Sequence, residues 1–240
     1  MAIKPVLLDL IKRADSEVDR FYANLSDGDK EIKGKADNWS AKDIVGHIAA
    51  WNEVSVKRLD AALGIGDPPE DVEDFDPVNH EIFLQNAGLT WPEVLNKIHS
   101  SHSEMIERIE RLSEKQLAEI GEYAWLKQSA LWKRTVGIEY PHLIAHFSQY
   151  YLDHDDKEHA DELQEKGTQL IGALDDSPSW QATVIYNLAC YYALSGQSQR
   201  AINGLKESLK LNPDLAEWSK EDPDLNSIRG LAEYKVLYSK

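Results

Sequence analysis

Apolar residues recur at intervals of three and four positions along most of this chain, which is the spacing of one face of an α-helix. The pattern predicts four long helices, over residues 5–24, 41–63, 91–112 and 138–166. A loop rich in Gly, Pro, Asp and Glu fills residues 64–77, and a short helix is predicted over 78–86. No segment shows the alternation of apolar and polar residues that marks a half-buried strand. The sequence therefore predicts an all-α protein.

Two of the predicted helices begin with capping residues. Ser40 can cap the second helix, and Asp43 stands in the reciprocal position three residues on. Thr90 and Glu93 repeat this arrangement at the third helix, with Pro92 in the first turn, where its missing N–H does no harm. Long helices joined by loops form a bundle when each buries one apolar face. We predict a four-helix bundle over residues 1–172.

The remaining segment, residues 173–240, is predicted to be a separate helical tail. Nearly all of the excess negative charge of the chain precedes residue 176, and two further helices are predicted over 179–194 and 198–211. The spacing of five tail residues is similar to that of a tetratricopeptide repeat: Tyr192, Gly196, Ala201, Leu205 and Pro213. A single repeat cannot bury its own apolar face. Residues 176–240 therefore need a neighbour, either the bundle, which the short linker favours, or a second copy of the chain in a homodimer, or a protein partner.

Composition excludes several classes of function. A hydrophobic content of 42% is typical of a globular protein. The formal net charge of −16 argues against nucleic-acid binding, because phosphate contacts need a basic surface. We find no apolar run long enough to cross a membrane and no signal peptide. The single cysteine, Cys190, lies in an apolar helical pattern and fits a buried thiol in a reducing compartment, so we expect a cytoplasmic protein.

The candidate chemistry rests on three histidines. His142 and His146 are four residues apart on a predicted helix, so both rings leave the same side. His47 lies at the edge of the apolar stripe of the second helix and is the candidate third ligand. Neutral imidazoles suit a divalent transition metal such as zinc, nickel or iron. The alternative is that all three are ordinary polar residues on partly exposed helix faces.

Four further residues are candidates for the wall of a pocket. Trp51 and Tyr150 each stand one turn after a proposed ligand, where they would contact an apolar substrate or simply fill the core. Asn79 and His80 follow the acidic loop and would close over the site, or else cap a helix. Glu53 is a candidate general base, although its angle on the second helix is unfavourable.

Two segments carry a resemblance to a known family. Residues 39–51, Trp-Ser-Ala-Lys-Asp-Ile-Val-Gly-His-Ile-Ala-Ala-Trp, together with the 76–79 region and His142-x-x-x-His146, resemble the DinB-like superfamily and within it the ClbS/DfsB branch. The resemblance implies a DinB-like four-helix bundle that binds a metal through His47, His142 and His146. Activities in that family include metal-dependent hydrolysis, thiol-dependent transfer or isomerisation, and protection against reactive small molecules. The tetratricopeptide-like hairpin is an addition that most DinB-like proteins lack.

Two functions from different classes follow. In the first, the bundle is a metal-dependent hydrolase or transferase that acts on a small molecule. In the second, it is a non-catalytic small-molecule binder or scaffold, and the tetratricopeptide-like tail mediates a protein interaction. Metal content distinguishes the two.

Overall fold

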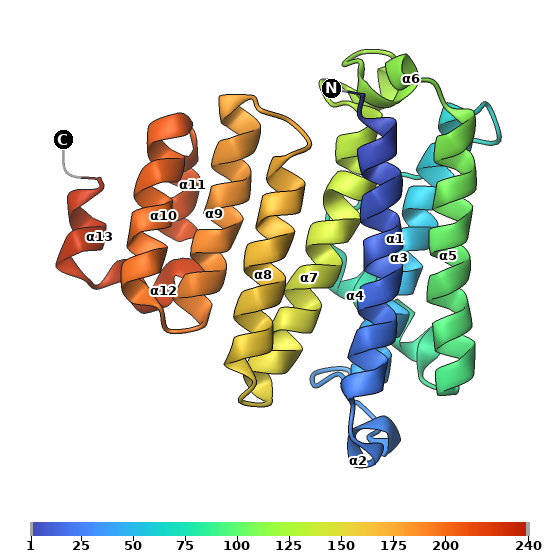
Figure 1. Cartoon of the computed structure of the whole chain (residues 1–240), viewed down its shortest axis with the longest axis horizontal. Coiled ribbons are helices and arrows are strands. Elements are labelled where there is room, and N and C mark those ends of the chain that lie inside the picture. The colour runs from blue at the N-terminus through green and yellow to red at the C-terminus, as the bar shows by residue number, and fades with distance from the viewer. Residues whose placement is uncertain (1, 239–240) are drawn as a thin grey trace. The chain divides into compact units, whose positions relative to one another are not determined.

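The computed structural model describes residues 2–238, and within that range it contains helices and short turns but no strand (Figure 1). The all-α prediction is confirmed. The chain divides into two compact units, the first ending at His146 and the second beginning at Phe147. This division falls earlier than residue 172, and the assignment of 1–172 and 173–240 as separate domains stays a prediction. None of the helices between residues 2 and 238 combines the length and the apolar character needed to cross a bilayer.

The first unit is built on the long helices α1 (Lys4–Asn24), α3 (Ala41–Ala62) and α5 (Trp91–Arg111), with the first part of α7 (Val136–Asp153). Their apolar faces are buried in the core, as the periodicity predicts: Leu7, Leu10, Val18, Ile48, Leu59, Ile98, Ile109 and Leu143. Side chains from all four helices meet around one small internal space, lined by Ala14, Asn52, His102 and Tyr140 among others. The first unit is thus a four-helix bundle.

Shorter elements connect the long helices of this unit: α2 (Asp27–Glu31), α4 (Phe75–Asn86), α6 (Glu114–Ala118), and the 3-10 turns η1 (Ala124–Leu126) and η2 (Leu131–Arg134). Helix α4 lies close against α3 because Gly46 carries no side chain. A Cβ atom at Gly46 would come within 3.0 Å of the Asn86 side-chain nitrogen. This close approach brings α4 and the acidic loop over the part of α3 that carries His47.

The start of α3 is defined by a buried capping box. The Ser40 backbone N–H and hydroxyl donate to Asp43 Oδ2 at 2.9 Å and 2.6 Å, and the Asp43 N–H donates back to Ser40 Oγ at 3.3 Å. Both side chains are buried. The box determines where α3 begins and therefore how Trp39 and His47 stand relative to the bundle.

The prediction of one helix over 138–166 is wrong, because the chain forms α7 and then a separate α8 (Lys157–Gly172). Asp155 adopts a φ of 58°, a left-handed conformation that a helix cannot continue through and that Asp tolerates better than most residues. The Asp156 carboxylate then accepts the N–H of His159 and caps α8. The local Asp-rich sequence therefore ends one helix and starts the next within a segment that the sequence analysis assigned to a single helix.

The second unit comprises α8, α9 (Pro178–Leu194), α10 (Ser198–Leu211) and a series of short elements: α11 (Leu215–Glu221), η3 (Pro223–Leu225), α12 (Asn226–Arg229) and α13 (Ala232–Val236). Helices α9 and α10 are the predicted hairpin. A Cβ atom at Gly204 would lie 3.1 Å from the Cβ of Ala189, so two small residues set the close approach of these helices. Residues that are distant along the chain complete the core of this unit: Ala160, Tyr186, Leu205, Leu225, Ile228 and Tyr234.

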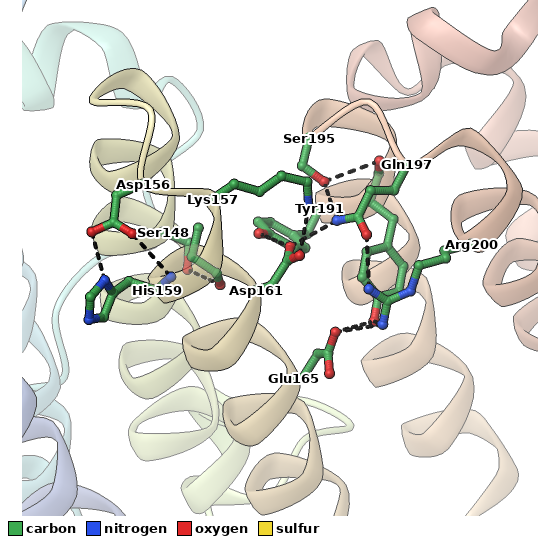
Figure 2. Close-up of polar contacts among 12 residues, drawn as sticks. Ser148, Asp156, Lys157, His159, Asp161, Glu165, Tyr191, Ser195, Gln197 and Arg200 are labelled. Atoms are coloured by element: carbon green, nitrogen blue, oxygen red, sulfur yellow. Dashed lines mark hydrogen bonds and ion pairs between the residues drawn. The ribbon is translucent and has the colours of Figure 1, made fainter.

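Polar contacts join α8 to the hairpin within the second unit, as Figure 2 shows. Asp161 accepts a hydrogen bond from the Tyr191 hydroxyl at 2.5 Å and another from Gln197 Nε2 at 2.8 Å. Glu165 pairs with Arg200, whose guanidinium also lies over the ring of Tyr192. One neighbour of the hairpin is therefore α8, which supplies both apolar contact and acceptors for buried hydroxyl groups.

The capping box of α3 leads to a stability prediction. Replacement Ser40→Ala keeps the backbone N–H bond to Asp43 but removes the hydroxyl that donates to the buried Asp43 carboxylate and accepts the Asp43 N–H. We therefore expect the free energy of unfolding to fall by about 1–2 kcal/mol. For a chain of this size the melting temperature should drop by roughly 3–6 °C, measured by circular dichroism. Ser26→Ala removes an equivalent box at the exposed start of α2 and is the matched control, expected to change melting far less. Equal shifts in the two variants would contradict the assignment of α3 as the anchored helix.

Candidate metal centre

Three imidazole nitrogens converge inside the first unit. His142 and His146 stand one turn apart on α7, and His47 reaches them from α3. The Nε2 atom of His142 lies 3.0 Å from His47 Nε2 and 3.0 Å from His146 Nε2. All three rings contribute ligand atoms that lie within 4.8 Å of one another. The structure thus brings together the three histidines that the sequence places on two separate helices.

Hydrogen bonds alone do not account for the close approach of these three nitrogen atoms. The Nε2 atom of a neutral imidazole either donates one proton or accepts one, so His142 can form a good bond with only one of its two neighbours. Two nitrogens bound to one transition metal at about 2.1 Å lie roughly 3.0–3.4 Å apart, which is the spacing observed. The donor set and its spacing therefore fit a divalent metal better than a hydrogen-bonded cluster.

Burial favours the neutral form of two of these rings, His47 and His146. Burial lowers the pKa of His47 to about 2, with a further contribution from charge on His146 and His142. Burial likewise lowers the pKa of His146 to about 3, and charge on His142 adds to the effect. A neutral imidazole has a free lone pair, which is the form that binds a metal.

Aromatic packing holds His47 in place. The Trp39 ring lies against it with centroids 4.6 Å apart, and Trp39 also approaches His146 at 6.2 Å. His47 Nδ1 is buried and makes no hydrogen bond within the described part of the chain. Its orientation therefore depends on packing, and Trp39 is a site residue that the helix pattern alone did not identify because it precedes the first turn of α3.

Glu139 is a second residue that the sequence reading missed. It is buried on α7, one turn before His142, and its Oε1 accepts a hydrogen bond from the Ser55 hydroxyl at 2.7 Å. Its Oε2 makes no hydrogen bond to any residue that the structure describes, and it lies 3.8 Å from His142 Nδ1. The i,i+3 spacing to His142 was the available signal, since it places both side chains on one helix face.

The three histidines open into a cavity of about 610 Å³ within the first unit. Its wall is formed by loop, helix and 3-10 residues with both apolar and charged side chains: Trp39, Trp51, Arg58, Asp71, Val72, Phe75, Asn79, Arg134, Ile138 and Glu139. A volume of this size suits a small organic molecule. The mixture of aromatic and charged groups suits a molecule with an apolar body and polar ends.

Of the other predicted site residues, some line the cavity and others do not. Trp51 and Asn79 line the cavity, and Trp51 Nε1 donates to Asn79 Oδ1 at 3.1 Å. His80 is exposed on α4 and is not a lining residue, because successive side chains of a helix point about 100° apart. Tyr150 belongs to the second unit, where its ring stacks on His154, so its place in the wall stays a prediction. Glu53 faces Lys97 at 3.7 Å and is not a lining residue.

A second group of potential ligands has different chemistry. Cys190, Asp222 and Asp224 lie together in the second unit. Burial raises the pKa of the Cys190 thiol well above its usual range, with nearby Asp222 adding to the effect. The Tyr186 hydroxyl donates to Asp222 at 2.7 Å, so this carboxylate is already engaged. A thiol that stays protonated is a poor metal ligand, and we assign this group to the core of the unit.

Comparison with known proteins connects the first unit to a family. The sequence profile of the DinB superfamily matches residues 10–149. The matched range covers more than half of the 240 residues and contains His47, His142 and His146. No curated protein and no solved structure matches the chain significantly.

The low pKa values of His47 and His146 predict a pH dependence for the metal-free chain. An unfolded histidine binds a proton below about pH 6.5, whereas these two stay neutral in the folded state down to about pH 3. The unfolded state therefore binds more protons in this window, and the free energy of unfolding should fall as the pH is lowered from about 6.5. The slope is at most on the order of 1 kcal/mol per pH unit for each histidine.

Urea denaturation at several pH values in the presence of a chelator measures this slope. The His47→Gln variant should show a flatter dependence than the wild type. His80→Gln changes an exposed histidine and should keep the wild-type slope. If His47→Gln retains the full slope, His47 is not held neutral in the folded protein.

Proposed function

The chain belongs to the DinB superfamily, and on that premise we propose that its first unit is a metal-dependent hydrolase or transferase acting on a small molecule. His47, His142 and His146 hold the metal in this proposal. The superfamily is generally metal-binding, and a set of three imidazoles is compatible with zinc, nickel or iron. The finer placement in the ClbS/DfsB-like branch, and a tetratricopeptide-like role for residues 173–240, belong to the same proposal and rest on sequence resemblance.

One observation supports the proposal most strongly. Three imidazole nitrogens meet at the wall of a cavity large enough for a substrate, with 3.0 Å separating His142 Nε2 from each of the others. A structural metal site is closed by four protein ligands. Here the cavity adjoins a set of three, so positions for water or substrate remain available. A divalent ion there would supply Lewis-acid chemistry, polarising a substrate group or making water more acidic.

Glu139 has a positioning role in this proposal. Its buried carboxylate lies on the Nδ1 side of His142, and a negative charge there favours the tautomer with the proton on Nδ1. That tautomer leaves the Nε2 lone pair directed toward His47 and His146. The hydrogen bond from Ser55 holds Glu139 in this orientation. A carboxylate behind a ligand histidine is a common way to orient the ring and raise its basicity.

Aromatic side chains form one side of the cavity. Trp39 and Trp51 cover the α3 side, and the Phe75 ring lies 5.5 Å from that of Trp51. Asn79 Oδ1 accepts a hydrogen bond from the indole N–H of Trp51, which fixes the orientation of the Trp51 ring. A rigid apolar wall of this kind binds the unreactive part of a substrate and keeps its reactive group beside the histidines.

Metal content tests the proposal directly. Protein purified without an affinity tag should contain about one equivalent of a transition metal by elemental analysis. The metal should be lost in His47→Ala and retained in His80→Ala, the exposed histidine that serves as control. Protein that contains no metal and takes up none near neutral pH would contradict the proposal. That result would favour the non-catalytic small-molecule binder.

The role of Glu139 leads to a separate prediction. Glu139→Gln keeps the size of the side chain but removes the charge facing His142, so we expect metal affinity to fall by about 10–100-fold. Competition with a chromophoric chelator measures this affinity. Glu53→Gln is the matched control, because Glu53 lies on α3 outside the cavity wall and should leave the affinity unchanged. Equal affinities in wild type and Glu139→Gln would rule out the positioning role.

A further inference from the structure

A buried guanidinium lines the same cavity as the three histidines. Arg58 follows His47 on α3 by about three turns, or roughly 16 Å along the helix axis at about 1.5 Å per residue. Both residues line the cavity, and Trp51 lies between them on the same helix. The side chain of Arg58 is buried, with an overall exposure of 9%. The cavity therefore has an imidazole cluster in one region and a permanent positive charge in another.

Arg58 has few partners for a buried charge. Its Nη1 donates to the backbone carbonyl of Arg134 at 3.1 Å. Within residues 2–238 it forms no ion pair with a carboxylate. A guanidinium carries five N–H donors and stays protonated, so burial without a counter-charge is costly. Burial and the nearby Arg134 lower the pKa of Arg58, and the charges of Glu139 and Asp71 offset only part of that effect.

The carboxylates of the cavity wall are engaged elsewhere. Asp71 accepts from Arg134 at 2.9 Å and from Lys127 at 3.3 Å. Glu139 accepts from Ser55 and faces His142. Arg58 is left as a cation directed to a cavity that still has room for a ligand.

We propose that Arg58 anchors the terminal carboxylate of the small molecule that this cavity binds. The apolar body of such a ligand would lie along Trp51 and Phe75, which would direct its other end toward the histidines. A planar carboxylate matches the fork of a guanidinium and accepts two parallel hydrogen bonds. A phosphate would bring a second negative charge close to Asp71 and Glu139, so a monoanion is favoured. This inference rests on the proposed function for the identity of the site, but it concerns binding and does not require a reaction.

Matched probes test the proposal on the full-length protein as purified. The probes are 4-phenylbutyrate, its neutral amide 4-phenylbutanamide, and 4-phenylbutylphosphonate, which can carry a second negative charge. Dissociation constants are measured by calorimetry at a mildly alkaline pH, where that second charge is present. We expect the carboxylate to bind at least about tenfold more tightly than the amide, and more tightly than the phosphonate. Arg58→Met should abolish the preference over the amide while leaving binding of the amide unchanged. Arg20→Met, at an exposed arginine on α1, is the control and should keep the preference.

Three outcomes would overturn the proposal. Equal binding of carboxylate and amide by the wild type, or no binding of either, would show that the cavity does not select an anion. Tighter binding of the phosphonate would assign a different ligand class. A preference retained in Arg58→Met would show that another group holds the anion. Arg58→Gln, which can still donate to the Arg134 carbonyl, repeats the test if the Met variant fails to fold.

Treatment with a chelator shows whether Arg58 or a metal at the histidines binds the carboxylate. The preference for carboxylate should persist after dialysis against EDTA. A preference that disappears with the metal would mean that the histidine centre holds the carboxylate, and it would overturn the role of Arg58. A protein found to contain no metal would contradict the proposed function but leave the comparison of probes intact.

Discussion

The convergence of three imidazoles, with His142 Nε2 lying 3.0 Å from both His47 Nε2 and His146 Nε2, is the interaction on which the rest of the first unit depends. Their spacing requires α3 and α7 to keep one register, since a shift of a single residue would rotate a histidine away by about 100°. Several features maintain that register. The Ser40–Asp43 box sets where α3 begins, Gly46 admits α4 beside His47, and Ser55 ties α3 to Glu139 on α7.

Burial favours the metal-binding form of the histidines, and it also makes a charged side chain in the same cavity unfavourable. Desolvation lowers the pKa of His47, and it also removes much of the water that would otherwise solvate the Arg58 guanidinium. Buried polar groups persist when they are paired, and among the described residues His47 Nδ1 and Glu139 Oε2 lack a hydrogen-bond partner. Arg58 donates to the Arg134 carbonyl. Unpaired groups around one cavity are typical of a site completed by ligands, whereas a structural core satisfies its polar atoms internally.

The second unit differs in its buried hydroxyl groups, although the buried Arg229 Nε makes no hydrogen bond among the described residues. Its tyrosine hydroxyls are buried but satisfied, since Tyr186 donates to Asp222 and Tyr191 donates to Asp161. Helix α8 exists as a separate element because Asp155 and Asp156 end one helix and cap the next. That break supplies the hairpin of α9 and α10 with a neighbour in its own unit. The paired polar groups and the small residues at Ala189 and Gly204 are features of a structural module.

The sequence by itself determined the first three long helices, the caps of α3 and α5, the hairpin and the three histidines as a candidate set, but it missed the break between α7 and α8. These features depend on residues within about four positions of one another in the sequence, and at that range the spacing determines which side chains share a helix face. Only the tertiary structure decided how deeply His47 lies, that Trp39 packs on it, and that Glu139 and Arg58 share one cavity wall. It also decided that His80 faces away from that wall. Burial and charge pairing are set by residues far apart in the chain, so no local pattern contains them.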